Sequence, residues 1–337
     1  MRNIIVLLFL VLSISCSQEK AIDFKIQKDI RTEVIVEDLY VRIPGDFIIL
    51  DNYFILIDPT DGNNAIKVYD RIGGKFRFDA AVKGYGPKEL IMPSTIWFRN
   101  GIEIFDIAGQ KIITYEADMV NMTIRPVFEQ NLETESFISK LIGYEYLRFI
   151  AISEELHGVV SHLNFEDKSN YAVLNYPIEN LTPSLLSNQF NGTLRLDPTG
   201  KFFAYSAYNT PYFSVHKIEN DSIYQLSSKF LTEPHFRITG GKFQWDEEKN
   251  IIGFMDMALA DNSLFLLHSN VLQVEANNRS ISSIPNIMYE FDFSGKPITR
   301  FVLDRRILRL AMSIEGELFG IALDEKDDKF KIIKIPI

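Results

Sequence analysis

Cysteine and histidine are scarce in this sequence, and their scarcity removes several kinds of site. The 337 residues include one cysteine and five histidines, namely His157, His162, His216, His235 and His268. A single cysteine cannot form a disulfide within the chain, so stability has to come from an apolar core. None of the histidines has the i, i+4 helical partner of a zinc site, and the first two, five positions apart, would lie on opposite faces of a strand. The Gly-x-Ser-x-Gly pattern of a hydrolase nucleophile elbow is also missing.

Positive charge and flexible linkers are lacking as well. The chain has 35 Lys and Arg against 45 Asp and Glu, and its net charge is −10 with the basic residues scattered. A nucleic-acid surface requires a basic stripe that neutralises phosphates, so the composition argues against a nucleic-acid partner. No stretch is rich enough in Pro, Gly and Ser to separate domains, and a hydrophobic content of 46% supplies one large core.

Long apolar runs are absent except at the N-terminus. Residues 1–15 contain Arg2, an apolar run over residues 4–12 and small residues before Cys16, which together indicate a secretory signal peptide. The run is about half the ~20 residues that a transmembrane helix needs. Cys16 directly follows "SIS", an order that resembles a bacterial lipobox with Ser13 where leucine is usual. We therefore expect a lipidated Cys16 and a tether over residues 16–30; the alternative is an ordinary buried or free thiol.

Short apolar runs dominate the rest of the chain and predict strands, because they are rich in Ile, Val, Phe and Tyr and are separated by turn-forming residues. Long helical periods are missing, although residues 133–149 could hold a helical turn. An Asp-x-x-Gly pattern recurs at Asp70, Asp106, Asp197 and Asp292, with a degenerate copy that ends at Gly316. We interpret each copy as a hairpin turn in which the aspartate accepts hydrogen bonds from backbone N–H groups and the glycine takes a positive φ.

The spacing of these turns predicts a β-propeller. Successive aspartates lie 36, 91 and 95 residues apart, so each longer interval fits two units of about 45 residues, the length of a four-stranded antiparallel blade. Residues 31–337 are then one all-β domain of six blades, with seven blades as an alternative. Residues 32–43 and 329–337 are expected to share the blade that closes the ring. A two-domain β-sandwich protein is the alternative fold.

The segment "KGYGPKEL" at residues 83–90 predicts a structural turn. Gly84 and Gly86 permit a tight backbone path, Pro87 fixes φ, and Glu89 can accept hydrogen bonds from the N–H groups of the turn. A phosphate-binding loop is excluded because Glu89 replaces the third glycine of G-x-G-x-x-G and no helix begins there.

This turn also carries a family resemblance. With the preceding "IKVYDRIGGKFRF", the later "YEFDFSGKPITRFVLD" and the lipobox, it resembles the G-x-G-P-x-E-[FL] signature of the TolB-like six-bladed β-propeller lipoproteins of Bacteroidetes. Lys88 stands where glycine is frequent in that family. The resemblance implies a propeller located in the bacterial cell envelope, and it brings no catalytic residues.

Two groups of residues are candidates for ligand binding. Exposed aromatic rings often bind sugars and peptides, and two segments combine such rings with turn formers. Their candidate residues are Tyr208, Tyr212, His235, Phe236, Phe243 and Trp245, of which about half are expected to lie in the core instead. The acidic segments at residues 58–64 and 324–329 suggest calcium, but neither has the ligand order of an EF-hand, so no cofactor is predicted and any metal site stays unknown.

These observations favour a non-catalytic binding module, held at the outer membrane by its N-terminal lipid and facing the periplasm or the cell surface. Its expected ligand is a protein, a glycan or a peptide. The alternative is a metal-assisted lactonase or lyase on the same ring, which would need several carboxylate or amide groups around a cation in the central channel. A third alternative is a purely protein-interaction role beside an outer-membrane transporter.

Overall fold

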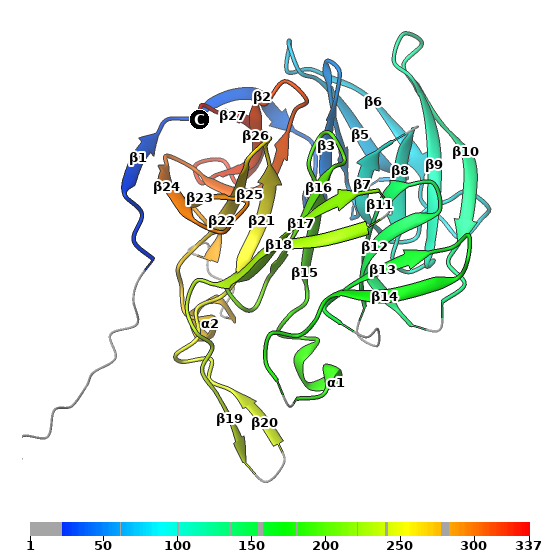
Figure 1. Ribbon diagram of the computed structural model, residues 1–337. Coiled ribbons are helices and arrows are strands. Elements are labelled where there is room, and N and C mark those ends of the chain that lie inside the picture. The colour runs from blue at the N-terminus through cyan, green and yellow to red at the C-terminus, as the bar shows by residue number, and fades with distance from the viewer. Residues whose placement is uncertain are drawn as a thin grey trace, which may run out of the picture.

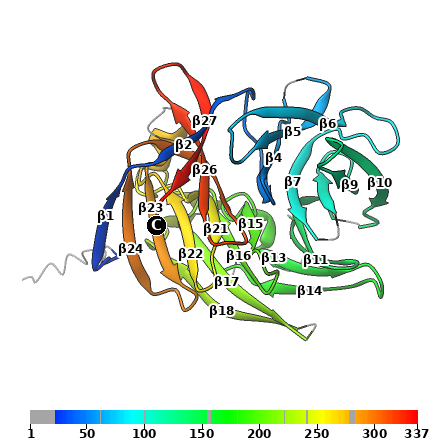
Figure 2. The same ribbon diagram turned by 90° about the horizontal axis from the view of Figure 1, so that it is seen from above.

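The computed structural model describes residues 22–60, 62–99, 101–134, 136–153, 158–179, 181–220, 222–239, 242–277 and 283–337. The expected signal peptide, Cys16 and His157 lie outside the described residues. Within them, six sheets, each with four antiparallel strands, are arranged around one axis (Figures 1 and 2). The prediction of an all-β, six-bladed propeller is therefore confirmed.

Each of the first four blades uses consecutive strands, in order from the axis to the rim. Blades one and two contain β3 (Phe47–Leu50), β4 (Tyr53–Ile57), β5 (Asn64–Asp70), β6 (Phe76–Val82), β7 (Pro93–Phe98), β8 (Ile102–Asp106), β9 (Lys111–Asp118) and β10 (Thr123–Asn131). Blades three and four contain β11 (Ile138–Glu145), β12 (Arg148–Ser153), β13 (Val160–Asn164), β14 (Ser169–Leu174), β15 (Gly192–Leu196), β16 (Phe202–Ala207), β17 (Tyr212–Glu219) and β18 (Ser222–Phe230).

The last two blades also use the N-terminal segment. Their strands are β21 (Phe254–Leu259), β22 (Ser263–His268), β23 (Ile287–Asp292), β24 (Pro297–Leu303), β25 (Arg306–Met312), β26 (Leu318–Asp324) and β27 (Lys329–Ile335). Strand β2 (Glu33–Leu39) pairs with β27 and completes blade six. The two ends of the chain therefore close the ring in one blade, which confirms that prediction.

A further N-terminal strand was not predicted. Strand β1 (Ile26–Ile30) adds a fifth, parallel strand to the outer edge of blade five by pairing with β24. Just before it, the Phe24 ring stacks on Tyr289 with ring centres 4.7 Å apart. Part of the segment expected to be a tether is thus integrated into the propeller.

The core lies between blades, which explains why the strands read as continuous apolar runs. Six hydrophobic clusters fill the six interfaces between neighbouring blades. Along β22, Leu264 and Leu266 pack toward blade four, whereas Phe265 and Leu267 pack toward blade six. Successive side chains of a strand point to opposite faces. When both faces are buried, apolar and polar residues do not alternate along the strand, and its sequence is a continuous apolar run.

The Asp-x-x-Gly turns are confirmed at three of the four aspartates. The carboxylate of Asp70 accepts from the N–H of Ile72 at 2.9 Å, that of Asp197 from Thr199 at 3.0 Å, and that of Asp292 from Ser294 at 2.9 Å. The pattern's own glycine has a positive φ at Gly200, Gly295 and Gly316, between 71° and 81°, but at Asp70 the positive φ of 62° belongs to Gly74 rather than to Gly73 of the pattern. These turns do not occupy equivalent places, since Asp197 follows the first strand of its blade whereas Asp70 and Asp292 end the third.

The interpretation of Asp106 as a turn cap was wrong. Its carboxylate accepts from the backbone N–H groups of Ile91 and Met92, both at 2.7 Å, in the segment that enters blade two. The positive φ in its turn belongs to Gln110, at 46°, rather than to glycine.

The suggested helical turn at residues 133–149 was also wrong, because the described part of this segment forms β11 and the start of β12. The short helices α1 (Pro183–Leu186) and α2 (Gln273–Asn277) lie in connections between strands. No helix among the described residues is long and apolar enough to cross a membrane. The supposed long loop after β18 contains a separate hairpin of β19 (Phe236–Thr239) and β20 (Lys242–Trp245).

Candidate functional site: the central cavity

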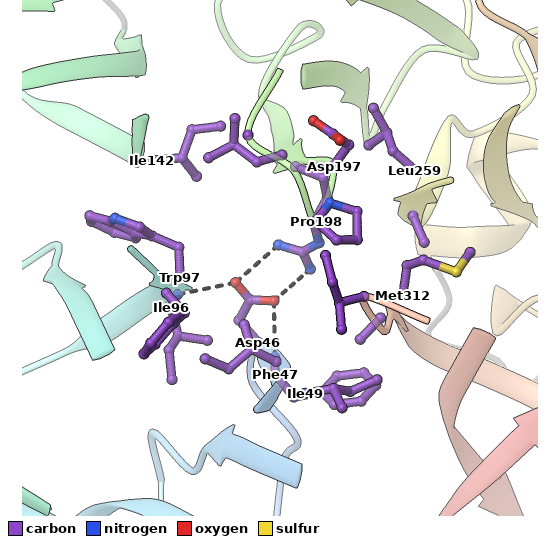
Figure 3. Close-up of a pocket in the computed structure, with 18 of the residues that line it drawn as sticks. Asp46, Phe47, Ile49, Ile96, Trp97, Ile142, Asp197, Pro198, Leu259 and Met312 are labelled. Carbon is purple, nitrogen blue, oxygen red and sulfur yellow. Dashed lines mark hydrogen bonds and ion pairs between the residues drawn. The ribbon is translucent and has the colours of Figure 1, made fainter. Parts of the chain in front are cut away.

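An ion cluster connects three blades at the propeller axis. Arg195, on the innermost strand of blade four, donates to Asp46 before β3 at 2.6 and 3.0 Å. The same guanidinium donates to Asp256 of β21 in blade five at 2.9 and 3.1 Å. The side chains of Arg195, Asp46 and Asp256 are 15%, 6% and 2% exposed. Figure 3 shows the Asp46 carboxylate facing this guanidinium, with apolar side chains around the pair.

The cluster also satisfies backbone groups at the inner edges of the sheets. The innermost strand of every blade is an edge strand, so its axis-facing N–H and C=O groups have no strand partner. Asp46 accepts from the N–H of Ile96 in blade two at 3.2 Å, and Asp256 accepts from the N–H of Leu310 in blade six at 2.9 Å. Arg309 donates to the carbonyl of Gly45 at 3.2 Å. The two carboxylates thereby join five blades.

A cavity of about 570 Å³ lies above this cluster, within the range typical of small-molecule sites. All six innermost strands contribute to its lining, mostly through their C-terminal halves. Apolar residues such as Ile142, Leu259 and Met312 form much of the wall, and the turn that begins at Asp197 and Pro198 also lines the cavity (Figure 3). The cavity therefore combines apolar walls with a polar floor.

The charges at the floor nearly cancel. Burial by itself lowers the pKa of Arg195, but the carboxylates of Asp256 and Asp46 raise that pKa above its ordinary value, so the guanidinium stays charged. One arginine and two aspartates carry a formal charge of −1, and Arg309 brings a second positive charge beside Asp46 through its contact with Gly45. The floor is therefore polar, but because its charges nearly cancel it attracts neither cations nor anions strongly.

The loop over residues 83–90 lies outside the cavity, between β6 and β7. The carboxylate of Glu89 accepts from the N–H of Gly86 at 2.8 Å, and the N–H of Gly84 donates to the carbonyl of Leu90 at 3.0 Å. A Cβ on Gly84 would stand 2.1 Å from the Glu89 carboxylate oxygen. The two glycines thus leave room for Glu89, and the loop directs the chain from the rim of one blade to the axis of the next.

The sequence profile of the TolB-like 6-blade propeller-like family matches residues 23–314 of this chain. The chain belongs to this family. No curated protein shows significant sequence similarity to this chain.

Solved structures share the TolB-like architecture at low sequence identity. A member of the duf4221 family from Bacteroides vulgatus ATCC 8482 superposes with a TM-score of 0.58 at 9% identity, over 92% of this chain and 96% of that one. A protein of Bacteroides fragilis NCTC 9343 that is assigned as exported gives 0.56 at 12% identity, over 93% and 98%. An auxiliary nutrient binding protein from Bacteroides thetaiotaomicron VPI-5482 gives 0.51 at 9% identity, over 90% and 76%. At these identities the likeness shows the fold alone.

The six aromatic candidates do not form one surface in this TolB-like propeller, and none of them lines the cavity. Tyr212 is 3% exposed and belongs to the core between blades three and four, so its assignment to a ligand face was wrong. Tyr208 follows β16, and the backbone of His235 is bound by the Asn250 side chain at the base of the β19–β20 hairpin. Phe236, Phe243 and Trp245 do come together, on that hairpin.

Sequence reasoning missed the residues of the cavity floor, although a signal was present. Arg195 and Asp256 interrupt apolar strands in the segments "TLRL" and "MDMAL". A charged residue within a buried strand is almost always paired, so these positions could have been marked as members of a buried cluster.

Proposed function

We propose that this protein is a lipid-anchored binding protein of the bacterial outer membrane, and that a glycan or a short peptide is bound in its central cavity. The cavity carries the proposal, because it joins apolar walls to a nearly neutral hydrogen-bonding floor. An uncharged or zwitterionic ligand suits such a site better than an ion does. The signal peptide and lipobox support the location, and the exported and nutrient-binding neighbours are consistent with it.

The floor geometry favours binding over metal-assisted hydrolysis. Hydrolysis of that kind needs several oxygen ligands free to hold one cation. The two carboxylates at the floor instead hold Arg195, and no group of three or more acidic, histidine or cysteine residues converges anywhere in the described part of the chain. The guanidinium occupies the place between the carboxylates that a cation would need.

A thermal-shift screen of the mature protein tests the proposal. The probes are short peptides, oligosaccharides and Ca²⁺, and at about 100 Kd a bound ligand adds ~2.7 kcal/mol to the free energy of unfolding. We expect Tm to rise with a peptide or an oligosaccharide. The variant Ile314→Trp narrows the cavity mouth at a residue that is 68% exposed and should reduce this rise.

Ile72→Trp is the matched control, because it adds the same side chain at an 81% exposed residue that does not line the cavity. It should leave the ligand response unchanged. Stabilisation by Ca²⁺ alone, together with ester or lactone hydrolysis that a single carboxylate substitution abolishes, would contradict the proposal and favour the hydrolase. A protein partner recovered by pull-down, with no shift from any probe, would favour a protein-interaction role.

A further inference from the structure

The β19–β20 hairpin has one apolar face and one polar face. Its register places Phe236 opposite Trp245 and Ile238 opposite Phe243. Residues directly opposite each other in an antiparallel pair point to the same side, so these four apolar side chains share a face. On the other face, Arg237 donates to the side-chain oxygen of Gln244 at 2.7 Å.

The apolar face continues from the propeller body into solvent. The Phe243 ring packs against the cluster between blades three and four, and the Phe236 ring lies parallel to the Trp245 indole with ring centres 6.4 Å apart. On the same face, Phe236 is 37% exposed and Ile238 is 54% exposed. Aromatic and aliphatic side chains beside an arginine are typical of segments that lie in the interfacial layer of a membrane.

The first described residues and the segment that leads to the hairpin pack against one hydrophobic cluster. Ile22 and Phe24 pack against the cluster between blades four and five, and so does Leu231, which directly follows β18 and leads to the hairpin. Lys229 near the end of β18 also donates to the carbonyl of Gly295, in the turn between β23 and β24, at 3.4 Å. In Figure 1, β1 lies at the left edge of the propeller and the β19–β20 hairpin projects from its lower side.

The length of chain before this cluster limits its distance from an anchor at Cys16. Six residue steps separate Cys16 from Ile22, and a fully extended chain covers at most ~3.5 Å per step, or about 20 Å. Each hairpin arm of four residues extends about 14 Å at ~3.4 Å per residue. An acylated Cys16 therefore keeps Ile22, and with it the cluster that also holds Leu231 five residues before β19, within about 20 Å of the bilayer.

We propose that the apolar face of the β19–β20 hairpin inserts into the interfacial layer of the membrane that holds the lipid anchor, as a second contact. This inference rests on the lipid anchor of the proposed function. The hairpin leads into the N-terminal end of β21, whereas the C-terminal end of that strand lines the cavity. Membrane contact through the hairpin thus turns the cavity mouth away from the bilayer.

The tryptophan content provides a direct test, because the chain contains only Trp97 and Trp245. The acylated protein carrying Trp97→Phe is reconstituted into phosphatidylethanolamine/phosphatidylglycerol vesicles with or without brominated acyl chains. Brominated chains should quench the fluorescence of Trp245. The matched variant Trp245→Phe retains only Trp97, which is 5% exposed in the propeller, and it should not be quenched.

Further outcomes distinguish membrane contact by the hairpin from membrane attachment by the lipid anchor, and from coverage of the apolar face by another protein. Adding Phe236→Ser and Ile238→Ser should remove quenching while the protein still floats with the vesicles. Flotation without quenching in the unaltered hairpin would overturn the membrane contact and leave the anchor intact. Failure to float would overturn both. A concentration-dependent blue shift of Trp245 without lipid would show that a second copy covers the face, and would also overturn the inference.

Discussion

Arg195 is the residue whose removal should harm the propeller most. Replacing it by methionine leaves the carboxylates of Asp46 and Asp256 buried at the axis without their cation. The loss of one partner from a buried ion pair costs about 3–5 kcal/mol. We therefore expect the free energy of unfolding of Arg195→Met to fall by that amount, measured by urea denaturation.

A triple variant gives the matched control for this prediction. Adding Asp46→Asn and Asp256→Asn to Arg195→Met removes the uncompensated charge and keeps oxygen acceptors for the N–H groups of Ile96 and Leu310. Much of the lost stability should return. Equal urea midpoints for Arg195→Met and the natural protein would show that the ion cluster contributes nothing.

At this scale the sequence predicts which residues are unusual but not which of them meet. The segment around Arg195 shows that a charge lies in an apolar strand. Its partners are 149 and 61 positions away, however, and only the closure of the ring brings them together. Tyr212 was misassigned for a related reason, because an aromatic residue beside turn formers looks the same in one sequence whether its ring points outward or into the core.

Among the structural elements, the loop from β6 to β7 is the one whose local chemistry gives a sharp prediction. Gly84→Ala would place a Cβ 2.1 Å from the Glu89 carboxylate oxygen, so the carboxylate has to move and lose its hydrogen bond to Gly86. We expect this variant to lose about 2 kcal/mol of unfolding free energy, within the range of core and backbone substitutions.

The same substitution should cost far less where Glu89 has already been replaced by alanine. In that background the atom that blocks the new Cβ is absent, so the two substitutions should be coupled by about 1–2 kcal/mol in a double-mutant cycle. Urea denaturation of the four proteins measures this coupling. Additive effects would mean that Gly84 is required for a reason other than the space that Glu89 occupies.

Elements with strong turn chemistry were predictable, and elements defined by distant contacts were not. Blade strands were found because they are apolar and end at residues such as Asp70 or Asp292. Strand β1 was missed because four of its five residues are exposed and its place depends on pairing with β24, a strand far away in the sequence. The helical turn expected at residues 133–149 failed because apolar spacing in a short segment does not distinguish a helix from two strands buried on both faces.

For the whole molecule, three buried histidines predict a fall in stability with acid, because burial lowers the pKa of His162, His216 and His268. Burial lowers the pKa of His216 to about 3 and that of His268 to about 4, although a hydrogen bond to the carbonyl of Ile252 partly opposes the second shift. Unfolding restores a pKa near 6.5 to each. Below pH 6.5 the unfolded chain therefore binds protons that the folded chain does not, and the folded state is destabilised as pH falls.

His216 and His268 should each reduce the unfolding free energy by about 1.4 kcal/mol per pH unit between pH 6.5 and 4. Urea denaturation at pH 7 and pH 5 measures the fall. The double variant His216→Gln, His268→Gln should lose most of it. Carboxylates such as Asp324, whose pKa a hydrogen bond from Lys331 lowers to about 2, affect stability only at lower pH. Equal stability at pH 7 and pH 5 would contradict the prediction.

The overall architecture was the most predictable level, because many short apolar runs separated by turn formers indicate one repeated four-stranded unit. The spacing of the Asp-x-x-Gly segments was a weaker guide than it looked, since these segments lie at different strands in different blades. The central cavity was less accessible, since its lining comes from short segments of all six blades. The propeller fold predicts that a central cavity exists. The chemistry of its floor depends on Arg195, Asp46 and Asp256, which meet only in the folded ring.

The order of the first two strands determines how the protein would bear a mechanical load. A pull on the N-terminal end reaches β1 first, and a force along that strand is resisted by all five of its residue pairs with β24 together. Strand β2, which closes the ring by pairing with β27, receives no tension until β1 has detached. A force on the N-terminal segment, such as drag on an anchored molecule, therefore loads β1 at the rim first. The pairing of β2 with β27, which closes the propeller, is loaded only afterwards.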